Sequence, residues 1–268
     1  MPKILDDLLD TLGVGTTPRI GLACSGGGAR GFSHVGVIMA LEKAGKKPEV
    51  LSGVSAGAIA AALYGAGLSP AEMLECFAEY NHVKDFTEWT IPKEGFFRLT
   101  KFARMLESWL PVKKMEEMPI PTVICATDFD HGKSVGWSKG DLVPRVVASC
   151  SIPILFTPVK IGGVNYVDGG VLRNLPAWAI RSRCTKLIGA NCSPLARDYK
   201  FKSSIVDIAL RSYQLMAKSN TLQDLNLCDY VVQTPAMARF GTFDMASMHK
   251  IVVAGYDAAS RVLEKANL

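Results

Sequence analysis

The strongest constraint on the fold of this chain is a pattern that occurs twice. In each case an apolar segment is followed by a glycine-rich turn and then by a helical segment. Residues 19–24 predict a buried strand, and after the glycines of 26–31 a helix is expected over 32–44. Residues 50–54 predict a second strand, followed at once by an alanine-rich helix over 56–66. Strands that alternate with helices are typical of a parallel sheet, because parallel strands need a crossover connection between them.

The alternation continues along most of the remaining chain. Further strands are expected over 120–126, 133–138, 186–190 and 230–233, and further helices over 141–149, 204–218 and 245–265. The pattern predicts an α/β fold with a central, mostly parallel sheet. We expect a short N-terminal extension over residues 1–18 and a single domain over residues 19–268.

Residues 80–118 interrupt this alternation and are interpreted as an aromatic-rich insertion. Residues 86–109 contain six aromatic side chains. Residues 93–114 contain six basic residues and only two acidic ones. One interpretation is a helical subdomain that packs its aromatic rings inward. The other is a cap that lines an acyl pocket or touches lipid.

Composition and charge exclude several classes of function. The 30 Lys and Arg exceed the 25 Asp and Glu by five and are dispersed, which argues against a nucleic-acid-binding protein. The seven cysteines include no Cys-x-x-Cys pair, so we expect neither a zinc site nor a redox pair. The chain starts without the apolar run of a signal peptide, and residues 56–68, its longest weakly polar stretch, are fewer than the ~18 of a membrane span. We expect a cytoplasmic protein, at most peripheral to a membrane.

Ser55 stands in the first motif with a chemical meaning, Gly53-Val54-Ser55-Ala56-Gly57. This Gly-x-Ser-x-Gly pattern follows a predicted strand and opens a predicted helix, the context that a nucleophile elbow requires. Flanking glycines avoid steric clashes at the sharp turn, and the helix N-terminus places free N–H groups nearby. The alternative interpretation is a tight strand-to-helix turn in which the serine only caps the helix.

The turn after the first strand carries a second motif, residues 26–31, which read GGGARG. Three successive glycines expose backbone N–H groups and let a ligand approach the chain closely. The segment also satisfies the Gly-x-Gly-x-x-Gly pattern of dinucleotide-binding folds, but Ser55 stands where such a fold needs an acidic residue. For Arg30 two interpretations stay open: an ion pair at the helix start, or a role in ordering the glycine loop or meeting a lipid phosphate.

The third motif is Asp168-Gly169-Gly170, which by itself is most typical of a plain turn. Together and in this order, the three motifs resemble those of the patatin-like phospholipases. The wider sequence of residues 21–67 is similar to that family's first block, and the segments 148–156 and 167–176 resemble two later ones.

This resemblance implies a three-layer α/β/α fold and a serine hydrolase that cleaves carboxylic esters of lipids, without a metal or an organic cofactor. The lipid is expected to be a phospholipid, a lysophospholipid or an acylglycerol. Ser55 would be the nucleophile and Asp168 the base of a Ser–Asp dyad. The oxyanion hole would be formed by Gly26, Gly27, Gly28 and Arg30. The remaining motif positions are Gly31, Gly53, Gly57, Gly169 and Gly170.

A carboxylate base has a physical consequence. An aspartate with an ordinary pKa of ~3.9 is a poor base at neutral pH, so partial desolvation has to raise the pKa of Asp168. The same carboxyl must also return the proton to the leaving alcohol, because a dyad contains no imidazole.

The alternative is a serine esterase with a histidine-containing triad that acts on small soluble esters. The order Ser55, Asp168, His249 matches the order of the α/β-hydrolases. His249 lies near the start of an amphipathic helix with no glycine-rich loop around it, which favours the dyad, and His34 is expected to brace the glycine loop. A third hypothesis is a binding protein on the same fold, against which the intact Ser55 and Asp168 argue.

Overall fold

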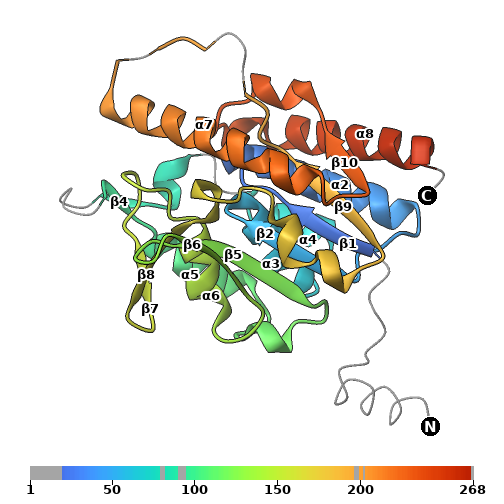
Figure 1. Ribbon diagram of the computed structural model, residues 1–268, viewed down its shortest axis with the longest axis horizontal. Helices are drawn as coiled ribbons and strands as arrows, with labels where there is room; N and C mark the ends of the chain where they lie inside the picture. The colour runs from blue at the N-terminus through green and yellow to red at the C-terminus, as the bar shows by residue number, and fades with distance from the viewer. Residues whose placement is uncertain (1–19, 79–81, 90–94, 196–198, 202, 267–268) are drawn as a thin grey trace.

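The central sheet of the molecule has a parallel half and an antiparallel half (Figure 1). A computed structural model gives the structure and describes residues 20–78, 82–89, 95–195, 199–201 and 203–266. Five strands run parallel in the spatial order β10-β9-β1-β2-β5. They are β1 (Ile20–Cys24), β2 (Val50–Val54), β5 (Thr122–Asp128), β9 (Lys186–Asn191) and β10 (Tyr230–Gln233). Helices cover both faces, so the predicted three-layer α/β/α fold is confirmed.

The antiparallel half brings two strand ends together. Its strands are β6 (Lys133–Trp137), β7 (Val159–Ile161) and β8 (Val164–Asp168). On one edge of β5, β2 pairs as far as Cys125 and β8 pairs from Ala126 onward, while β6 occupies the opposite edge. Because β2 and β8 run toward each other along that edge, the residues at their carboxyl ends meet. Two of the predicted site residues, Ser55 and Asp168, are thereby neighbours in space.

The two faces of the sheet pack against different layers. On one face lie α2 (Phe32–Lys43), α3 (Ala56–Gly65), α5 (Thr100–Trp109), α6 (Leu142–Ser149) and α8 (Met248–Ala266). The other face is covered by short 3-10 turns over residues 176–183 and by the end of α7 (Ile205–Leu225). Successive strand residues point to opposite faces. Leu22 of β1 accordingly joins the first core and Ala23 the second.

Residues 82–89 and 95–118, the described part of the predicted insertion, include a two-stranded ribbon and a helix. The ribbon pairs β3 (Glu88–Trp89) with β4 (Phe97–Arg98), and α5 follows. Phe86 and Phe102 are buried in the main core, whereas Trp89 is largely exposed. The aromatic residues therefore divide between packing inward and facing solvent.

Several elements depart from the expectation. Helix α7 continues seven residues past the predicted end at residue 218, because its polar residues Thr221 and Asp224 are buried against the rest of the protein. A short helix not foreseen from the sequence, α4 (Pro70–Glu75), begins with a capping box between Ser69 and Glu72. The predicted N-terminal extension lies outside the described residues.

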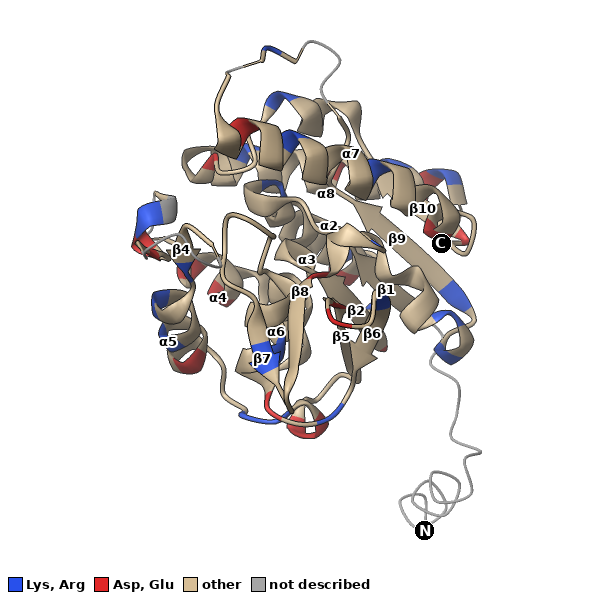
Figure 2. Cartoon of the chain, turned by 60° about the vertical axis from the view of Figure 1, so that its left-hand side comes forward, with Lys and Arg blue, Asp and Glu red and all other residues tan. Residues whose placement is uncertain are grey.

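In Figure 2 the positions of Lys and Arg and those of Asp and Glu are scattered over several helices and loops of the described chain. Within the described ranges, no helix combines the length and the apolar character that crossing a bilayer requires.

Candidate active site

Ser55 occupies a strained position between β2 and α3. Its backbone has φ +53° and ψ −123°, in the region that residues other than glycine rarely adopt. The Ser55 N–H donates to Ser149 Oγ at 2.9 Å, and Ser149 Oγ donates to the Cys125 carbonyl at 2.6 Å. The Ser55 carbonyl accepts the Ala58 N–H at 2.8 Å. Such strain costs on the order of 1–3 kcal/mol and persists only where the surroundings fix it, as these bonds do.

The motif glycines allow this turn to pack tightly. A Cβ on Gly57 would overlap the carbonyl of Cys24, so any side chain there would push α3 away from β1. The other motif positions at which an added Cβ would lie too close to neighbouring atoms are Gly26, Gly27, Gly28, Gly31, Gly53, Gly169 and Gly170.

Asp168 at the end of β8 is fully buried, and its two carboxylate oxygens have different surroundings. Oδ1 accepts the N–H of Gly170 and the hydroxyl of Tyr213, both at 2.9 Å. Oδ2 accepts no hydrogen bond from any described residue. Burial raises the pKa of Asp168 to about 6, although the nearby Ser55 hydroxyl, the Gly170 N–H and the Tyr213 hydroxyl each lower it. The carboxylate is therefore ionised near neutral pH yet far more basic than an exposed aspartate.

Tyr213 on α7 is a site residue that the sequence analysis missed. Its ring is buried, and Gly170 makes its approach possible, since a Cβ at that position would overlap the tyrosine hydroxyl. Nothing in the local sequence marks this tyrosine, because its partner lies 45 residues earlier in the chain. Ser149 was missed in the same way, although it lies in one of the segments that carried the family resemblance.

Helix α7 also holds the loop that follows Asp168. Asn220 Nδ2 donates to the Gly170 carbonyl at 2.9 Å, and its Oδ1 accepts the Asn174 N–H at 2.8 Å. Arg173 donates to both oxygens of the buried Asp224, at 2.6 and 2.8 Å. The aspartate loop is thus fixed at several points along one helix.

The glycine loop presents two backbone donors beside Ser55. The Gly26 N–H already donates to the Asn174 carbonyl at 3.1 Å, whereas the N–H groups of Gly27 and Gly28 donate to no other described residue. Gly28 has φ +61°, which favours glycine, and a Cβ there would overlap the carbonyl of Thr242. Gly26 is therefore a packing residue of the loop, and its two successors are the available donors.

Arg30 and His34 stabilise this loop through hydrogen bonds to backbone carbonyls. Arg30 is buried and donates through Nε to the Gly27 carbonyl at 3.3 Å and through Nη1 to the Pro194 carbonyl at 3.1 Å. It forms no ion pair with a described carboxylate, so of its two interpretations the ordering of the loop is the one that the contacts support. His34 Nε2 donates to the Ser25 carbonyl at 2.8 Å, as expected.

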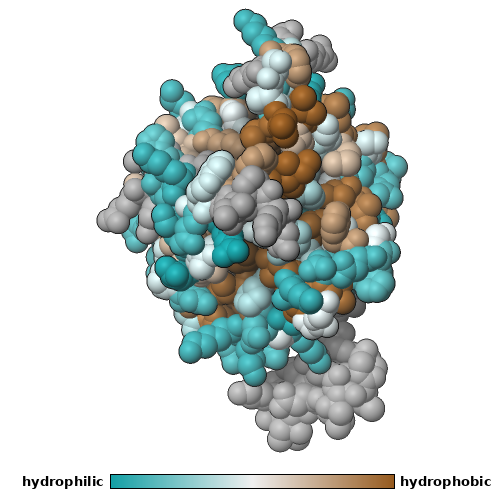
Figure 3. Space-filling model, turned by 90° about the vertical axis from the view of Figure 1, so that its left-hand side faces the viewer, coloured by the Kyte–Doolittle hydropathy of each residue, from teal (hydrophilic) through white to brown (hydrophobic). Residues whose placement is uncertain are grey.

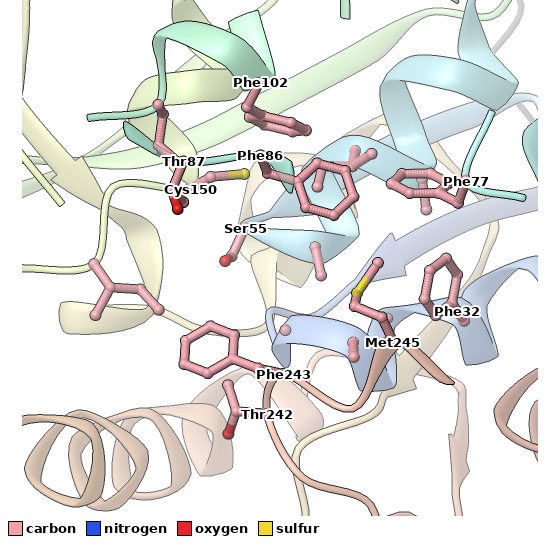
Figure 4. A pocket seen from close by; sticks show the side chains of 18 of the residues that line it. Phe32, Ser55, Phe77, Phe86, Thr87, Phe102, Cys150, Thr242, Phe243 and Met245 are labelled. Carbon is pink, nitrogen blue, oxygen red and sulfur yellow. The ribbon is translucent and has the colours of Figure 1, made fainter. Parts of the chain in front are cut away.

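Ser55 opens into an apolar pocket of about 150 Å³ (Figure 4). Phe86 and Cys150 lie on one side of the serine and Phe243 on the other. Most of the other residues that line the pocket are apolar as well and include Phe32, Leu63, Met73, Phe77 and Phe102. A smaller pocket next to it is shared by Ser55, Gly27, Arg30 and Tyr213. The serine therefore stands between an apolar cavity and the polar groups of the loop.

His249 is not brought to this site. It is exposed on the first turn of α8 and lines a different groove, together with Arg239 and Asp257. In the described part of the chain, no cluster of three or more His, Cys, Asp or Glu side chains is arranged to hold a metal ion.

Comparison with known proteins shows the family to which this chain belongs. Residues 22–180 match the family model of the patatin-like phospholipases, which is more than half of the chain. The chain belongs to the patatin-like phospholipase family. Tyr213 and the whole of α7 lie beyond the matched residues, so the family motifs end before the helix that holds the aspartate.

Individual relatives of this patatin-like chain are considerably longer. An uncharacterized NTE family protein of Mycobacterium bovis is 34% identical over 169 residues, 60% of this chain and 45% of the relative. Lysophospholipase NTE1 of Debaryomyces hansenii is 28% identical over 194 residues, 68% of this chain and 12% of the relative. The crystal structure of VipD from Legionella pneumophila, at 15% identity, has a TM-score of 0.50 and covers 94% of this chain and 67% of VipD, a similarity of fold. The chain spans less than half the length of the relatives matched by sequence.

Proposed function

We propose that this patatin-like protein hydrolyses carboxylic esters of lipids, with Ser55 as the nucleophile and Asp168 as the base. The arrangement of the buried carboxylate carries the proposal. Gly170 and Tyr213 hold one oxygen, while the other is left free beside a serine on a strained turn. Unpaired buried carboxylate oxygens are costly, and a base with a raised pKa beside a nucleophile is typical of a catalytic site.

The reaction follows from this arrangement in two steps. Asp168 takes the hydroxyl proton as Ser55 attacks the ester carbonyl, and the N–H groups of Gly27 and Gly28 donate to the oxyanion that forms. The carboxyl then returns its proton to the leaving alcohol, and an acyl-serine remains. Water hydrolyses the acyl-serine with Asp168 again acting as the base.

The substrate class follows from the pocket and the family. An apolar cavity next to the nucleophile favours an aliphatic acyl chain over a polar acyl group. A relative named lysophospholipase supports a phospholipid, a lysophospholipid or an acylglycerol as the ester. A histidine triad has no support from the position of His249.

The decisive experiment combines active-site labelling with an ester panel. A fluorophosphonate should label the wild-type protein but not Ser55→Ala, and it should still label Ser108→Ala, which removes an exposed hydroxyl on α5. Hydrolysis of acyl esters should rise as the chain lengthens from acetate toward long-chain acids. Labelling of Ser55→Ala at another serine would refute the assignment of the nucleophile.

A further inference from the structure

Two exposed apolar side chains belong to segments that also line the active-site pocket. Trp89 is 70% exposed and Ile154 51% exposed, although both belong to segments whose neighbouring residues line the pocket. Thr87 lies two residues before Trp89, and Ile152 and Phe156 flank Ile154. The wall of the pocket thus continues outward into an apolar surface.

Ile154 is held in this exposed position at a conformational cost. Its φ of +73° lies in the left-handed region, where a β-branched residue is a genuine outlier. The Phe96 N–H donates to the Ile154 carbonyl at 3.1 Å, and the Phe97 N–H donates to the Leu155 carbonyl at 2.9 Å. These bonds fix a strained backbone that turns an apolar side chain toward solvent. Packing does not explain an isoleucine at this position.

Trp89 belongs to the same unit. Its ring makes edge-type contact with Phe97 at 5.4 Å and a tilted contact with Phe96 at 6.1 Å between ring centroids. Phe96 and Phe97 are the residues whose backbone binds the Ile154 segment. The two exposed side chains are therefore carried by one hydrogen-bonded unit.

The start of α7 extends this surface. Phe201, Ile205 and Ile208 are all exposed, and Ile205 reaches 69%. Figure 1 places the beginning of α7 and strand β4 at the same end of the molecule, and Figure 3 shows hydrophobic side chains gathered on the face at that end. The term apolar rim is used below for this set, which comprises Trp89, Ile154, Phe201, Ile205 and Ile208.

We propose that the apolar rim docks onto the surface of a lipid bilayer, so that an acyl chain passes from the bilayer into the pocket. The proposal rests on the function proposed above. A bilayer is the occupant that fits, because the segments that carry Trp89 and Ile154 also line the pocket with Ser55. A bilayer seated on the rim would bring ester-linked acyl chains to these segments, whereas a protein seated there would not. Exposed apolar patches of this kind mark interaction sites.

The first test measures binding without turnover. Ser55→Ala protein is mixed with phosphatidylcholine vesicles, and the vesicle-bound fraction is determined by flotation. Adding Ile154→Asn or Trp89→Ser to the Ser55→Ala protein should weaken partition about tenfold each, since each removes a large apolar side chain from the bilayer. Val253→Asn is the matched control, because Val253 is 58% exposed on α8 and lies outside the rim and the pocket lining. Equal binding by all variants would overturn the proposal.

The second test uses the strain at Ile154. Asparagine tolerates the left-handed region better than isoleucine does, so Ile154→Asn should unfold at the same temperature as wild type or a higher one. A lower unfolding temperature together with unchanged vesicle binding would show that Ile154 serves the fold, and would refute its role in docking.

A third measurement separates this proposal from the proposed function. A water-soluble short-chain ester should be hydrolysed equally by wild type and by Ile154→Asn with Ser55 intact, whereas hydrolysis of vesicle lipid should fall about tenfold in the variant. No hydrolysis of either substrate by wild type would refute the enzymatic function and leave the binding result to be judged alone. Self-association that is abolished by Ile154→Asn, without vesicle binding, would assign the rim to a second copy of the chain and overturn the bilayer proposal.

Discussion

Ser55 and Asp168 meet along the same edge of β5. The contacts that hold the serine come from nearby residues of the chain, whereas those that hold the aspartate come from distant ones. The serine turn is fixed by the glycines on either side of it and by one bond to Ser149. The aspartate is fixed by α7, through Tyr213 and through the contacts of its loop. One half of the site is therefore a local structure, and the other depends on a helix that begins 37 residues later. The two halves should respond differently to substitution.

The largest effect is expected for Asp168→Asn, which keeps the size of the side chain and removes the proton acceptor. General-base catalysis contributes roughly 10²- to 10⁴-fold, so kcat with a short-chain ester should fall by that factor. Fluorophosphonate labelling should slow in parallel, because the serine is no longer activated. Wild-type kcat in a folded Asp168→Asn protein would exclude this carboxylate as the base.

The same variant also has a predicted effect on stability. The folded-state pKa of Asp168 is about 6, against ~3.9 in the unfolded chain. Between these values the folded protein holds a proton that the unfolded chain has released, so wild-type stability falls as the pH rises from ~4 to ~6. Asp168→Asn escapes this cost and should be more stable above pH 6 by about 3 kcal/mol, a gain that disappears below pH 4. Denaturant unfolding at two pH values measures it.

Tyr213→Phe tests the half of the site that depends on α7, and its expected effect on activity is smaller than that of Asp168→Asn. Losing a hydrogen bond to a charged group is worth about 1.5–3 kcal/mol, so the pKa of Asp168 should rise by roughly one to two units. In the pH profile of kcat/KM, the acidic limb should move to higher pH by that amount, and activity should largely return at high pH. A phenylalanine that only loosened the fold would lower activity at every pH. Tyr199→Phe is the control, because it removes a tyrosine hydroxyl that bonds to Asp207 and lines neither pocket beside Ser55.

Gly27→Ala tests the local half. The added Cβ would overlap the sulfur of Cys192, so the loop must shift and carry its N–H donors away from the oxyanion. We expect kcat to fall about tenfold with little change in KM, since complete loss of one donor costs 10²–10³. Cys192→Ala in the same protein should restore much of the activity by making room. An inactive double variant with wild-type stability would contradict this explanation.

The contrast between local and distant contacts also explains how much of the molecule could be predicted from the sequence. The strand–glycine–helix units around residues 26–31 and 53–57 are local, so their turn chemistry indicated the candidate nucleophile and the candidate backbone donors. Tyr213 could not be found in that way, because α7 has apolar residues on two faces, with Tyr213 and Ala217 buried and Ile205 and Ile208 exposed. Such a helix gives no clear amphipathic signal that would indicate its buried side.

The end of α7 shows the same difficulty in a different form. The predicted helix ends at residue 218, and several of the polar residues that follow, such as Asn220 and Asp224, have low helix propensity. Asn220 and Asp224 instead contact the aspartate loop, so tertiary hydrogen bonds extend the helix to Leu225. The antiparallel pairing of β8 with β5 was likewise not apparent, although it places Asp168 opposite Ser55.

The smallest effect is expected for His249→Ala, and this variant distinguishes a dyad from a triad. A histidine base normally gives an acidic limb near pH 6–7, and burial raises the pKa of Asp168 to about 6, so the limb of the wild-type profile cannot separate the two. The substitution can, because His249 is exposed in a groove away from the pocket of Ser55. Activity and acidic limb should both remain at wild-type values, while Tyr213→Phe moves the limb. A severe loss of kcat in folded His249→Ala, with a limb that Tyr213→Phe leaves in place, would instead assign proton transfer to the histidine.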